Sequence, residues 1–381
     1  MPASPSTARA INDRLALDFL QRQGPLTAGQ LKTLTGLSRP TVADLVDRLQ
    51  GSGLIEVVGE AGAERRGPNA RLYGIVAGLA HLAALDVRTQ SVAVVVSDLL
   101  GTTLAEASLP IGRDTGTEPA VEQAAALLER TAREAGAARL HSVGIGAPGL
   151  IDPATGELRD SAGLPAWHGR LVGALNERLP ATVLVENETN LAAVAEQRLG
   201  AARDHDTFAF LWLGQGVGAA VVLDGKLRRG ASGGAGEIGF LPVPGTAGLP
   251  SATDCEGGFD SLVNLGAITR LAAEHGIDVP VEEAVRAPAG ERGAAFLDAL
   301  AARVALGVAA VAAVLDPGFV VLGGEIGHAG GEDLAARVEK RTAGLTPLRT
   351  QVRPGALGGG AVLSGALLIA RDAAQDDLFG G

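Results

Sequence analysis

The hydrophobic pattern of this chain changes near residue 80, and the change predicts two domains of different architecture. Before that point, apolar residues recur at helical spacing with turn residues between the runs. After it, short runs rich in Val, Ile and Leu alternate with helical segments. The length of 381 residues agrees, because it exceeds the size of one ordinary domain. We therefore expect one domain over residues 1–78 and a larger one over 79–381.

The first domain is predicted to open with three short helices. Ile11, Leu15 and Phe19 are four residues apart and mark one face of the first helix. Thr27 and Ser38 are candidate N-caps of the second and third helices, because a hydroxyl there accepts from a free backbone N–H. Apolar residues at helical spacing predict the buried face of the third helix, which comprises Val42, Leu45, Val46 and Leu49.

Two short strands are expected after the helices, over 54–58 and 70–75. The tight turn at 36–38 separates the second and third helices, as in a helix-turn-helix. The loop between the strands carries Arg65 and Arg66 beside glycine and proline, which suits contact with phosphate or the minor groove. This layout predicts a winged helix-turn-helix, and a small helical bundle with an unrelated hairpin is the alternative.

The third helix is the predicted DNA-recognition element. Arg39 and Thr41 lie at its start, the part of such a helix that reads base edges in the major groove. Asp44 and Asp47 on the outward face repel phosphate, so we expect a homodimer or a dimer of dimers to double the contacts to double-stranded DNA. The predicted DNA-binding residues are Ser38, Arg39, Thr41, Arg48, Arg65 and Arg66.

Charge is distributed unevenly along the chain. The net charge is −11, which argues against a protein that coats nucleic acid or an anionic membrane. Residues 1–80 nevertheless carry a net charge of +2, whereas the remainder carries −13. Such asymmetry favours a small unit that tolerates phosphate, attached to a large acidic body.

Composition favours a cytoplasmic globular protein. The apolar fraction of 46% is enough for a packed core and excludes intrinsic disorder. The most apolar stretch, 304–315, has 12 residues and falls short of the ~20 that a membrane-spanning helix needs. The N-terminal sequence lacks the apolar segment of a secretory signal. Cys255 is the single cysteine, so we expect neither an internal disulfide nor a cysteine-cluster zinc site.

After residue 80 the chain is predicted to fold into two similar α/β halves. Each half opens with a meander of strands and continues with alternating helices and strands. The strands are expected at 82–86, 91–96, 102–109, 141–146 and 182–186 in the first half, and at 208–213, 218–223 and 319–322 in the second. Two such halves suggest two lobes around a cleft, and the glycine-rich segment 214–218 is predicted to be a tight hairpin.

Four motifs follow one another in this region: GIGAPGLID at 144–152, ENETNLAAVAE at 186–196, LGQGVGAAVVLDGKLRRGASGGAGEIGF at 213–240 and LDPGFVVLGGEIG at 315–327. With the N-terminal winged helix, they resemble the ROK family of repressors, open reading frames and kinases. The resemblance implies a two-lobed actin/hexokinase-like (ribonuclease H-like) ATPase fold. Lobe one would span about 79–200 plus a C-terminal helix at 361–376, and lobe two about 201–360. Some members are sugar kinases, and others are repressors of sugar genes that carry a DNA-binding domain.

Two departures from the family's kinase pattern argue against phosphoryl transfer. The Asp-x-Gly-Gly-Thr turn that approaches phosphate is replaced here by residues 86–90, with Arg88 and Thr89 in place of the glycines. The base position holds Glu188 instead of Asp, and a carboxylate misplaced by ~1 Å can cost ~10² in rate. The resemblance therefore implies no catalytic residue and no nucleotide cofactor. An active ROK sugar kinase with an appended regulatory domain is the alternative.

The zinc site that many members carry is not matched in this chain. Phe240 stands in place of its histidine, and Cys255 is alone in the cysteine run, whereas a structural zinc site needs four N or S ligands. We therefore expect no metal, and Cys255 is predicted to be a small buried residue.

A sugar pocket is implied by the same resemblance. Its effector-binding residues would be Gly149, Asn187, Glu188 and Glu237, because carboxylates and amides suit vicinal sugar hydroxyls. Phe240 and Ser261 replace two further sugar contacts of the family. Either the ligand differs from glucose-like sugars or the pocket has lost its ligand. A purely structural role for Glu237, satisfying backbone amides in 233–239, is the alternative at that position.

The leading hypothesis is a sequence-specific DNA-binding transcriptional regulator, a repressor of carbohydrate-related genes. Its kinase-like domain would sense a sugar or sugar-derivative effector and support oligomerisation. Besides the kinase, a third hypothesis is a protein-interaction module whose winged helix docks a protein. Indifference to DNA at low salt, where phosphate attraction is strongest, would favour that third hypothesis.

Overall fold

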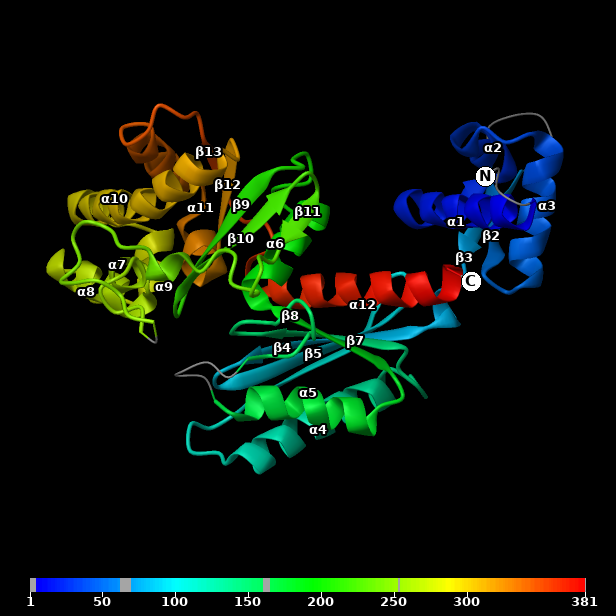
Figure 1. Ribbon diagram of the computed structural model, residues 1–381, viewed down its shortest axis with the longest axis horizontal. Helices are drawn as coiled ribbons and strands as arrows, with labels where there is room; N and C mark the ends of the chain where they lie inside the picture. The colour runs from blue at the N-terminus through cyan, green and yellow to red at the C-terminus, as the bar shows by residue number, and fades with distance from the viewer. Residues whose placement is uncertain (1–4, 62–69, 160–164, 253, 381) are drawn as a thin grey trace.

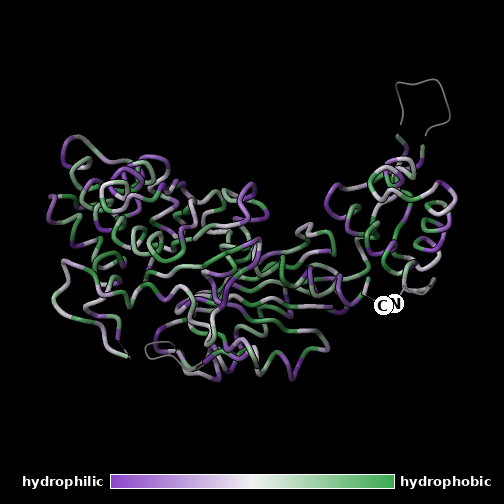
Figure 2. The backbone as a smooth tube through the Cα atoms, turned by 45° about the horizontal axis from the view of Figure 1, so that its top comes forward, coloured by the Kyte–Doolittle hydropathy of each residue, from purple (hydrophilic) through white to green (hydrophobic). Residues whose placement is uncertain are grey.

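The computed structural model describes residues 5–61, 70–159, 165–252 and 254–380. Figure 1 shows a small N-terminal unit set apart from two larger lobes, with a long C-terminal helix, α12 (Ala361–Phe379), running toward that unit. Hydrophobic and hydrophilic segments alternate along the chain in all three parts (Figure 2).

The N-terminal unit is a winged helix-turn-helix. Its helices are α1 (Pro5–Gln23), α2 (Ala28–Thr35) and α3 (Arg39–Gly51). Its antiparallel sheet has the order β1-β3-β2, and the strands are β1 (Leu26–Thr27), β2 (Ile55–Ala61) and β3 (Ala70–Ile75). Because β3 pairs with the strand that leads into α2, the hairpin is part of the domain, and the alternative of a helical bundle with an unrelated hairpin is wrong.

Local sequence signals determine where the helices begin and end. The Thr27 hydroxyl accepts from the Gln30 N–H, while the Gln30 side chain accepts from the Thr27 N–H, which completes a capping box. The Ser38 hydroxyl accepts from the Thr41 N–H at 3.4 Å and caps α3. Gly36 ends α2 with a φ of 69°, a conformation that glycine adopts without strain. The predicted caps and turn are confirmed.

The face of α1 that packs inward is not the face predicted from the four-residue spacing of Ile11, Leu15 and Phe19. Ala16, Leu17 and Leu20 are buried, whereas Ile11 is 58% and Leu15 is 36% exposed. Apolar residues occur on both sides of this helix, so periodicity alone predicted the helix but not the side that packs against α2 and α3.

Lobe one is built on a five-stranded sheet with the order β6-β5-β4-β7-β8. The first three strands form an antiparallel meander and the last two are parallel to β4: β4 (His81–Arg88), β5 (Ser91–Asp98), β6 (Thr103–Pro110), β7 (Ser142–Ala147) and β8 (Thr182–Asn187). Alternate residues of β4 enter different cores, so Leu85 packs under α4 (Thr117–Glu134) and α5 (Trp167–Arg178), while Ala84 packs under α6 (Glu188–Leu199) and α12.

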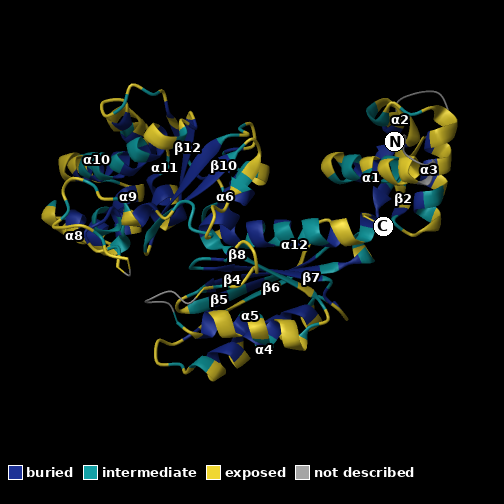
Figure 3. Cartoon of the chain, viewed as in Figure 1, coloured by how far each residue is buried: buried dark blue, intermediate teal, exposed yellow. Residues whose placement is uncertain are grey.

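Lobe two repeats this topology with the order β11-β10-β9-β12-β13. Its strands are β9 (Phe208–Leu213), β10 (Val217–Leu223), β11 (Lys226–Arg228), β12 (Phe319–Gly323) and β13 (Gln351–Pro354). Its helices are α7 (Asp260–Val263), α8 (Leu265–Glu274), α9 (Val281–Arg286), α10 (Gly290–Leu315) and α11 (Gly324–Thr342). Figure 3 shows the central strands of this lobe as buried beneath the helices. The repeated sheet order confirms the predicted two-lobed, ribonuclease H-like α/β fold.

Within the described residues, three single-turn 3₁₀ helices connect these elements. They are η1 (Ala77–Leu79) between the winged helix and lobe one, η2 (Ile238–Phe240) in lobe two, and η3 (Gly358–Gly360) immediately before α12.

Helix α10 is longer than the apolar stretch considered from the sequence. By length and composition it is apolar enough to cross a membrane, so the expectation that no segment reaches that length is corrected. Half of its most apolar window is nevertheless buried, and Leu297, Leu300 and Val304 lie in the core of lobe two. The packing of α10 within that core accounts for its apolar composition.

Helix α12 joins the winged helix to lobe one. Ala366 packs with Ala84 and Leu191 on the lobe-one side, whereas Ala374 and Phe379 belong to the same buried cluster as the winged-helix core. An ion pair between Arg14 of α1 and Asp376 of α12, at 2.5 Å, adds a polar contact at this junction. One helix thus contacts both parts of the chain.

Candidate functional site

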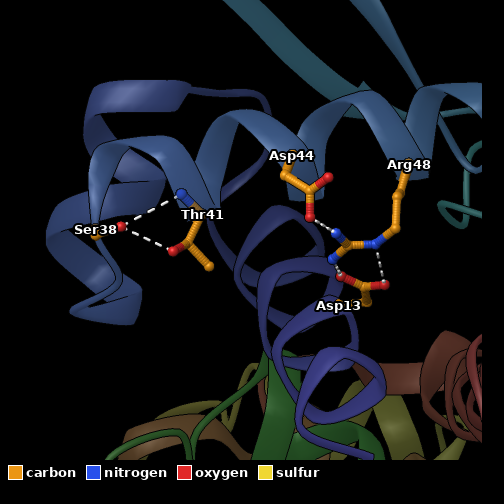
Figure 4. A network of polar contacts seen from close by, with 5 residues as sticks. All are labelled: Asp13, Ser38, Thr41, Asp44 and Arg48. Carbon is orange, nitrogen blue, oxygen red and sulfur yellow. Dashed lines mark hydrogen bonds and ion pairs between the residues drawn. The ribbon is translucent and has the colours of Figure 1, made fainter. Parts of the chain in front are cut away.

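The outward face of α3 is free to meet a partner. Ser38, Arg39 and Thr41 are exposed at its start, while the opposite face is buried in the winged-helix core, as predicted. The Ser38 and Thr41 hydroxyls lie 2.8 Å apart and hydrogen bond to each other (Figure 4). Arg39 has no ion pair within the ranges that the structure describes, so its guanidinium is available to a ligand.

Arg48 lies on the same helix but points toward α1. Its Nη2 atom donates to Asp13 Oδ1 at 2.6 Å, and Nη1 donates to Asp44 one turn earlier (Figure 4). The hydrogen bond to Asp13 is the main reason that the pKa of Arg48 is raised. The structure therefore shows Arg48 joining α3 to α1 and compensating the Asp44 charge. Asp47, which is also exposed, has no ion pair among the described residues.

The two wing arginines of the prediction, Arg65 and Arg66, lie outside the described residues. The strands that flank their loop, β2 and β3, pair in an antiparallel ribbon with a register irregularity between Val57 and Gly59.

Asn187 lies where β8 meets α6, and protein atoms occupy its whole side chain. Its Oδ1 accepts from the N–H groups of Thr189 and Asn190 and caps α6. Its Nδ2 donates to the Gly149 carbonyl at 3.0 Å and to Glu188 Oε2 at 2.9 Å. In this conformation Asn187 positions two of the other predicted effector residues.

Glu188 is the most strongly perturbed carboxyl group of the predicted pocket. Burial raises its pKa to about 8, with smaller contributions from the charges of Asp86 and Glu237, while Arg88 opposes the rise. Glu188 is consequently protonated at neutral pH. A neutral carboxyl group can donate as well as accept, but a protonated group is not a ready general base.

Glu237 is an exposed residue that immediately precedes η2, and its carboxyl group has no hydrogen-bond or ion-pair partner among the described residues. Burial raises its pKa, and no hydrogen bond joins its side chain to another described residue. The alternative that Glu237 satisfies the backbone amides of 233–239 is therefore not what this structure contains. Its charge contributes to the pKa of Glu188, which places the two carboxyl groups within electrostatic range of each other.

Arg88 ends β4, at the turn that leads into β5. Its Nε donates to Asp86 at 2.7 Å on the same strand, and Nη1 donates to Glu325 at 3.1 Å, at the start of α11 in lobe two. Its guanidinium lies 5.0 Å from the centre of the Trp212 ring. The Arg88 side chain thus bridges the two lobes at this turn.

The preserved glycine segment forms a tight hairpin, as predicted. Gly214 N–H donates to the Gly216 carbonyl at 3.1 Å, and β9 pairs with β10 directly beyond the turn. A Cβ atom at Gly214 would collide with Glu325, the partner of Arg88, which gives this glycine a packing role.

A second ion pair between the lobes was not anticipated from the sequence. Glu186, buried at the end of β8, accepts from Arg229 Nε at 2.6 Å and from Asn190 Nδ2 at 2.9 Å. Both charged residues line a cavity of about 490 Å³ that also includes Asp152 and Leu227. Their separation of 43 residues follows no recognisable spacing, so only the fold could pair them.

The region of the family's zinc site does not fit a metal ion. Over the described residues, no three His, Cys, Asp or Glu side chains gather into a possible metal site. Phe240 is 38% exposed. Cys255 is half-buried, which corrects the prediction that it is buried, and burial together with the nearby Asp260 raises its thiol pKa to about 11.

Sequence models of known protein families match both the N-terminal unit and the two-lobed body. A sequence model described as the ROK family matches residues 82–373, and one described as the MarR family matches residues 11–66.

Relatives include both a repressor and a kinase. The chain is 25% identical over 239 residues to a xylose repressor of Caldicellulosiruptor bescii, covering 62% of this chain and 59% of the relative. It is 28% identical over 208 residues to a glucokinase of Halalkalibacterium halodurans, covering 50% and 63%. These matches span about three-fifths of the length of each relative.

The fold as a whole matches a solved structure. A ROK family transcriptional regulator, described as a homologue of the Escherichia coli MLC protein, superposes with a TM-score of 0.78 at 19% identity, covering 98% of both chains. At 19% identity this similarity establishes the fold, including the winged helix, but not the function.

Proposed function

The chain belongs to the ROK family, and on this premise we propose that it is a sequence-specific DNA-binding transcriptional regulator, a repressor of carbohydrate-related genes. One observation carries the proposal: a winged helix precedes the ROK body and presents the polar start of α3 to solvent. The match to a xylose repressor supports the link to carbohydrate genes.

The proposed DNA contacts are those of a recognition helix in the major groove. Arg39 and Thr41 would read base edges, and Ser38 would contact the backbone from the helix start. Arg65 and Arg66 of the wing would reach phosphate or the minor groove. Arg48 would contribute by holding α3 against α1, because its guanidinium is already paired with Asp13.

The kinase-like body would serve as sensor and scaffold. Its effector, a sugar or sugar derivative, would be held by Gly149, Asn187, Glu188 and Glu237. We propose the division into a DNA-binding domain over 1–78 and a ROK body over 79–381. The ROK body would have lobe one at about 79–200 plus 361–376 and lobe two at about 201–360. The break follows β3, which ends at Ile75, and precedes β4, which begins at His81.

A homodimer or a dimer of dimers would provide the operator contacts. A single recognition helix buries too little surface on DNA for operator-level specificity. Two recognition helices related by a two-fold axis double the buried surface. The protein would act in the cytoplasm, together with its operator.

The body would not phosphorylate sugars. Arg88 fills the phosphate turn and pairs with Glu325, and Glu188 is protonated at neutral pH. The alternative, an active sugar kinase, draws on the glucokinase relative. Coupled measurement of ATP consumption with a panel of hexoses separates the two, because turnover with any hexose would establish the kinase.

The proposal is tested by selecting genomic DNA fragments on the full-length protein. We expect a recurring palindromic sequence, bound at least ~10³-fold more tightly than random DNA at physiological salt. Fragments without a shared sequence, or equal affinity for random DNA, would refute it.

A further inference from the structure

The chain passes between the two lobes at two places, and both crossings contact one side chain. The first crossing leaves α6 at Leu199 and enters β9 at Phe208, and the second leaves β13 at Pro354 and enters α12 at Ala361. Glu196, near the end of α6, contacts both and is 1% exposed. A rotation of one lobe against the other must bend the chain at these crossings, so a residue that holds both restricts the rotation.

Each oxygen of the Glu196 carboxyl group accepts a hydrogen bond from a different crossing. Oε2 accepts from the Ala201 N–H at 2.7 Å, and Oε1 accepts from the Leu357 N–H at 2.9 Å. Glu196 has no ion pair among the residues that the structure describes. A buried carboxyl group is costly unless it is hydrogen bonded, and an apolar side chain in its place would leave both N–H groups without this acceptor.

Glycine at both crossings lets the backbone approach the carboxyl group. A Cβ atom at Gly200 would collide with Oε2 of Glu196, and one at Gly355 would lie 2.9 Å from Oε1. The Gly355 carbonyl is also hydrogen bonded to Nδ1 of His328, at 2.9 Å, on α11 of lobe two. The second crossing is therefore held from lobe one by Glu196 and from lobe two by His328.

We propose that Glu196 is the positioning residue of the hinge between the lobes: by holding both crossings, it fixes the angle between the lobes and the direction in which α12 begins. Leu357 lies four residues before α12, so a hinge that loosens at Glu196 also frees the start of the helix whose other end, at Phe379, lies in the winged-helix core. The inference goes beyond the proposed function and holds whether or not the protein binds DNA.

The test measures the distance between the lobes by double electron–electron resonance on the full-length protein. Spin labels are attached at Glu129→Cys on α4 and Glu332→Cys on α11, both exposed positions, and Cys255→Ser removes the natural thiol. Glu196→Gln keeps the size of the side chain, but its NH₂ group cannot accept from one of the two N–H groups. We expect a broader distance distribution than in the labelled parent, or a second distance.

Glu339→Gln is the matched control. Glu339 Oε2 also accepts from a backbone N–H, that of Val352 at 2.8 Å, but both residues belong to lobe two, and the substitution changes the formal charge equally. This variant should leave the distance between the lobes unchanged. Because the Arg88–Glu325 ion pair also joins the lobes, each measurement is repeated with Glu325→Gln, where Glu196→Gln should have a larger effect.

Hydrogen exchange locates the change within the chain. In Glu196→Gln the amide of Ala201 or of Leu357 should exchange at least about tenfold faster, as expected for a lost hydrogen bond to a carboxyl group, while the strands β9 and β12 stay protected. Gly355→Ala is a second variant, because its Cβ atom displaces the same carboxyl group from the other crossing. It should broaden the distance distribution as Glu196→Gln does.

A distance distribution that Glu196→Gln leaves unchanged, with and without Glu325→Gln, would overturn the inference, and so would equal broadening in Glu339→Gln. Faster exchange throughout lobe one at an unchanged distance would make Glu196 a residue that only stabilises α6. If Glu196→Gln does not fold, the same criteria apply to Gly355→Ala. Operator selection tests the proposed function independently, so either proposal can fail without the other.

Discussion

Arg39 stands at the first position of α3, exposed and without an ion pair among the residues that the structure describes. We expect Arg39→Ala to weaken operator binding by about 1–3 kcal/mol, which is about 5- to 150-fold, the value of a bidentate contact to a base. The estimate needs little correction for changes in the free protein, because removing the Arg39 side chain breaks no internal ion pair. The buried face of α3 and its Ser38 cap stay in place.

Fluorescence anisotropy with the selected operator and with a scrambled duplex of equal length measures this effect. Arg22→Ala is the matched control, because Arg22 is exposed in the last turn of α1 and its loss changes the net charge equally. The control should weaken both duplexes slightly and to the same extent. Equal weakening of operator and scrambled duplex by Arg39→Ala would refute base reading and make Arg39 a phosphate contact.

Four further outcomes are expected. Glu237→Gln should leave operator affinity intact and abolish the response to an effector, as measured by anisotropy with and without ligand; loss of both would identify a folding residue. Glu188 has a folded-state pKa of about 8, above its ordinary value of 4.5, so between these pH values the unfolded state loses this proton while the folded state keeps it, and the free energy of unfolding falls as pH rises. Urea unfolding between pH 5.5 and 8.5 should therefore show that the unmodified protein loses stability relative to Glu188→Gln, and parallel curves would contradict the raised pKa. Phe379→Ala should destabilise the winged helix by about 3–5 kcal/mol, because the ring is 8% exposed within its core, and thermal unfolding with and without the substitution measures this. Light scattering should report a dimer or tetramer at micromolar concentration, and a monomer bound to one half-site would exclude the proposed assembly.

Local signals made the winged helix predictable from the sequence. Thr27 and Ser38 act on backbone groups within three residues of themselves, and Gly36 acts on the helix that it ends. Because these caps depend only on residues close together in the sequence, the positions of the helices and of the turn could be predicted from the sequence.

The ion pairs of Arg88 and Arg48 could not be predicted in the same way. The Arg88–Glu325 bond joins residues 237 positions apart, and it exists because the two sheets bring the β4–β5 turn against the start of α11. The sequence indicated that Arg88 displaces glycine from a phosphate turn, but not which carboxylates would neutralise it. Arg48 is a similar case, because its spacing suggested a DNA contact and its partner Asp13 lies on another helix.

The position of α12 determines how a ligand between the lobes can affect the winged helix. Just before this helix, the Leu357 N–H donates to Glu196 of α6 at 2.9 Å, and Gly358 lies against His328 of lobe two. Its middle packs on lobe one, and Phe379 at its end lies in the winged-helix core. A ligand changes DNA affinity only if it prefers one arrangement of the lobes over another and that arrangement alters the DNA-binding unit. Because α12 contacts lobe one and the winged helix, and Gly358 just before it lies against lobe two, a displacement of lobe two that moves the start of the helix also acts on the unit that carries α3. The ligand and the operator can therefore be coupled through packing alone, without a catalytic step.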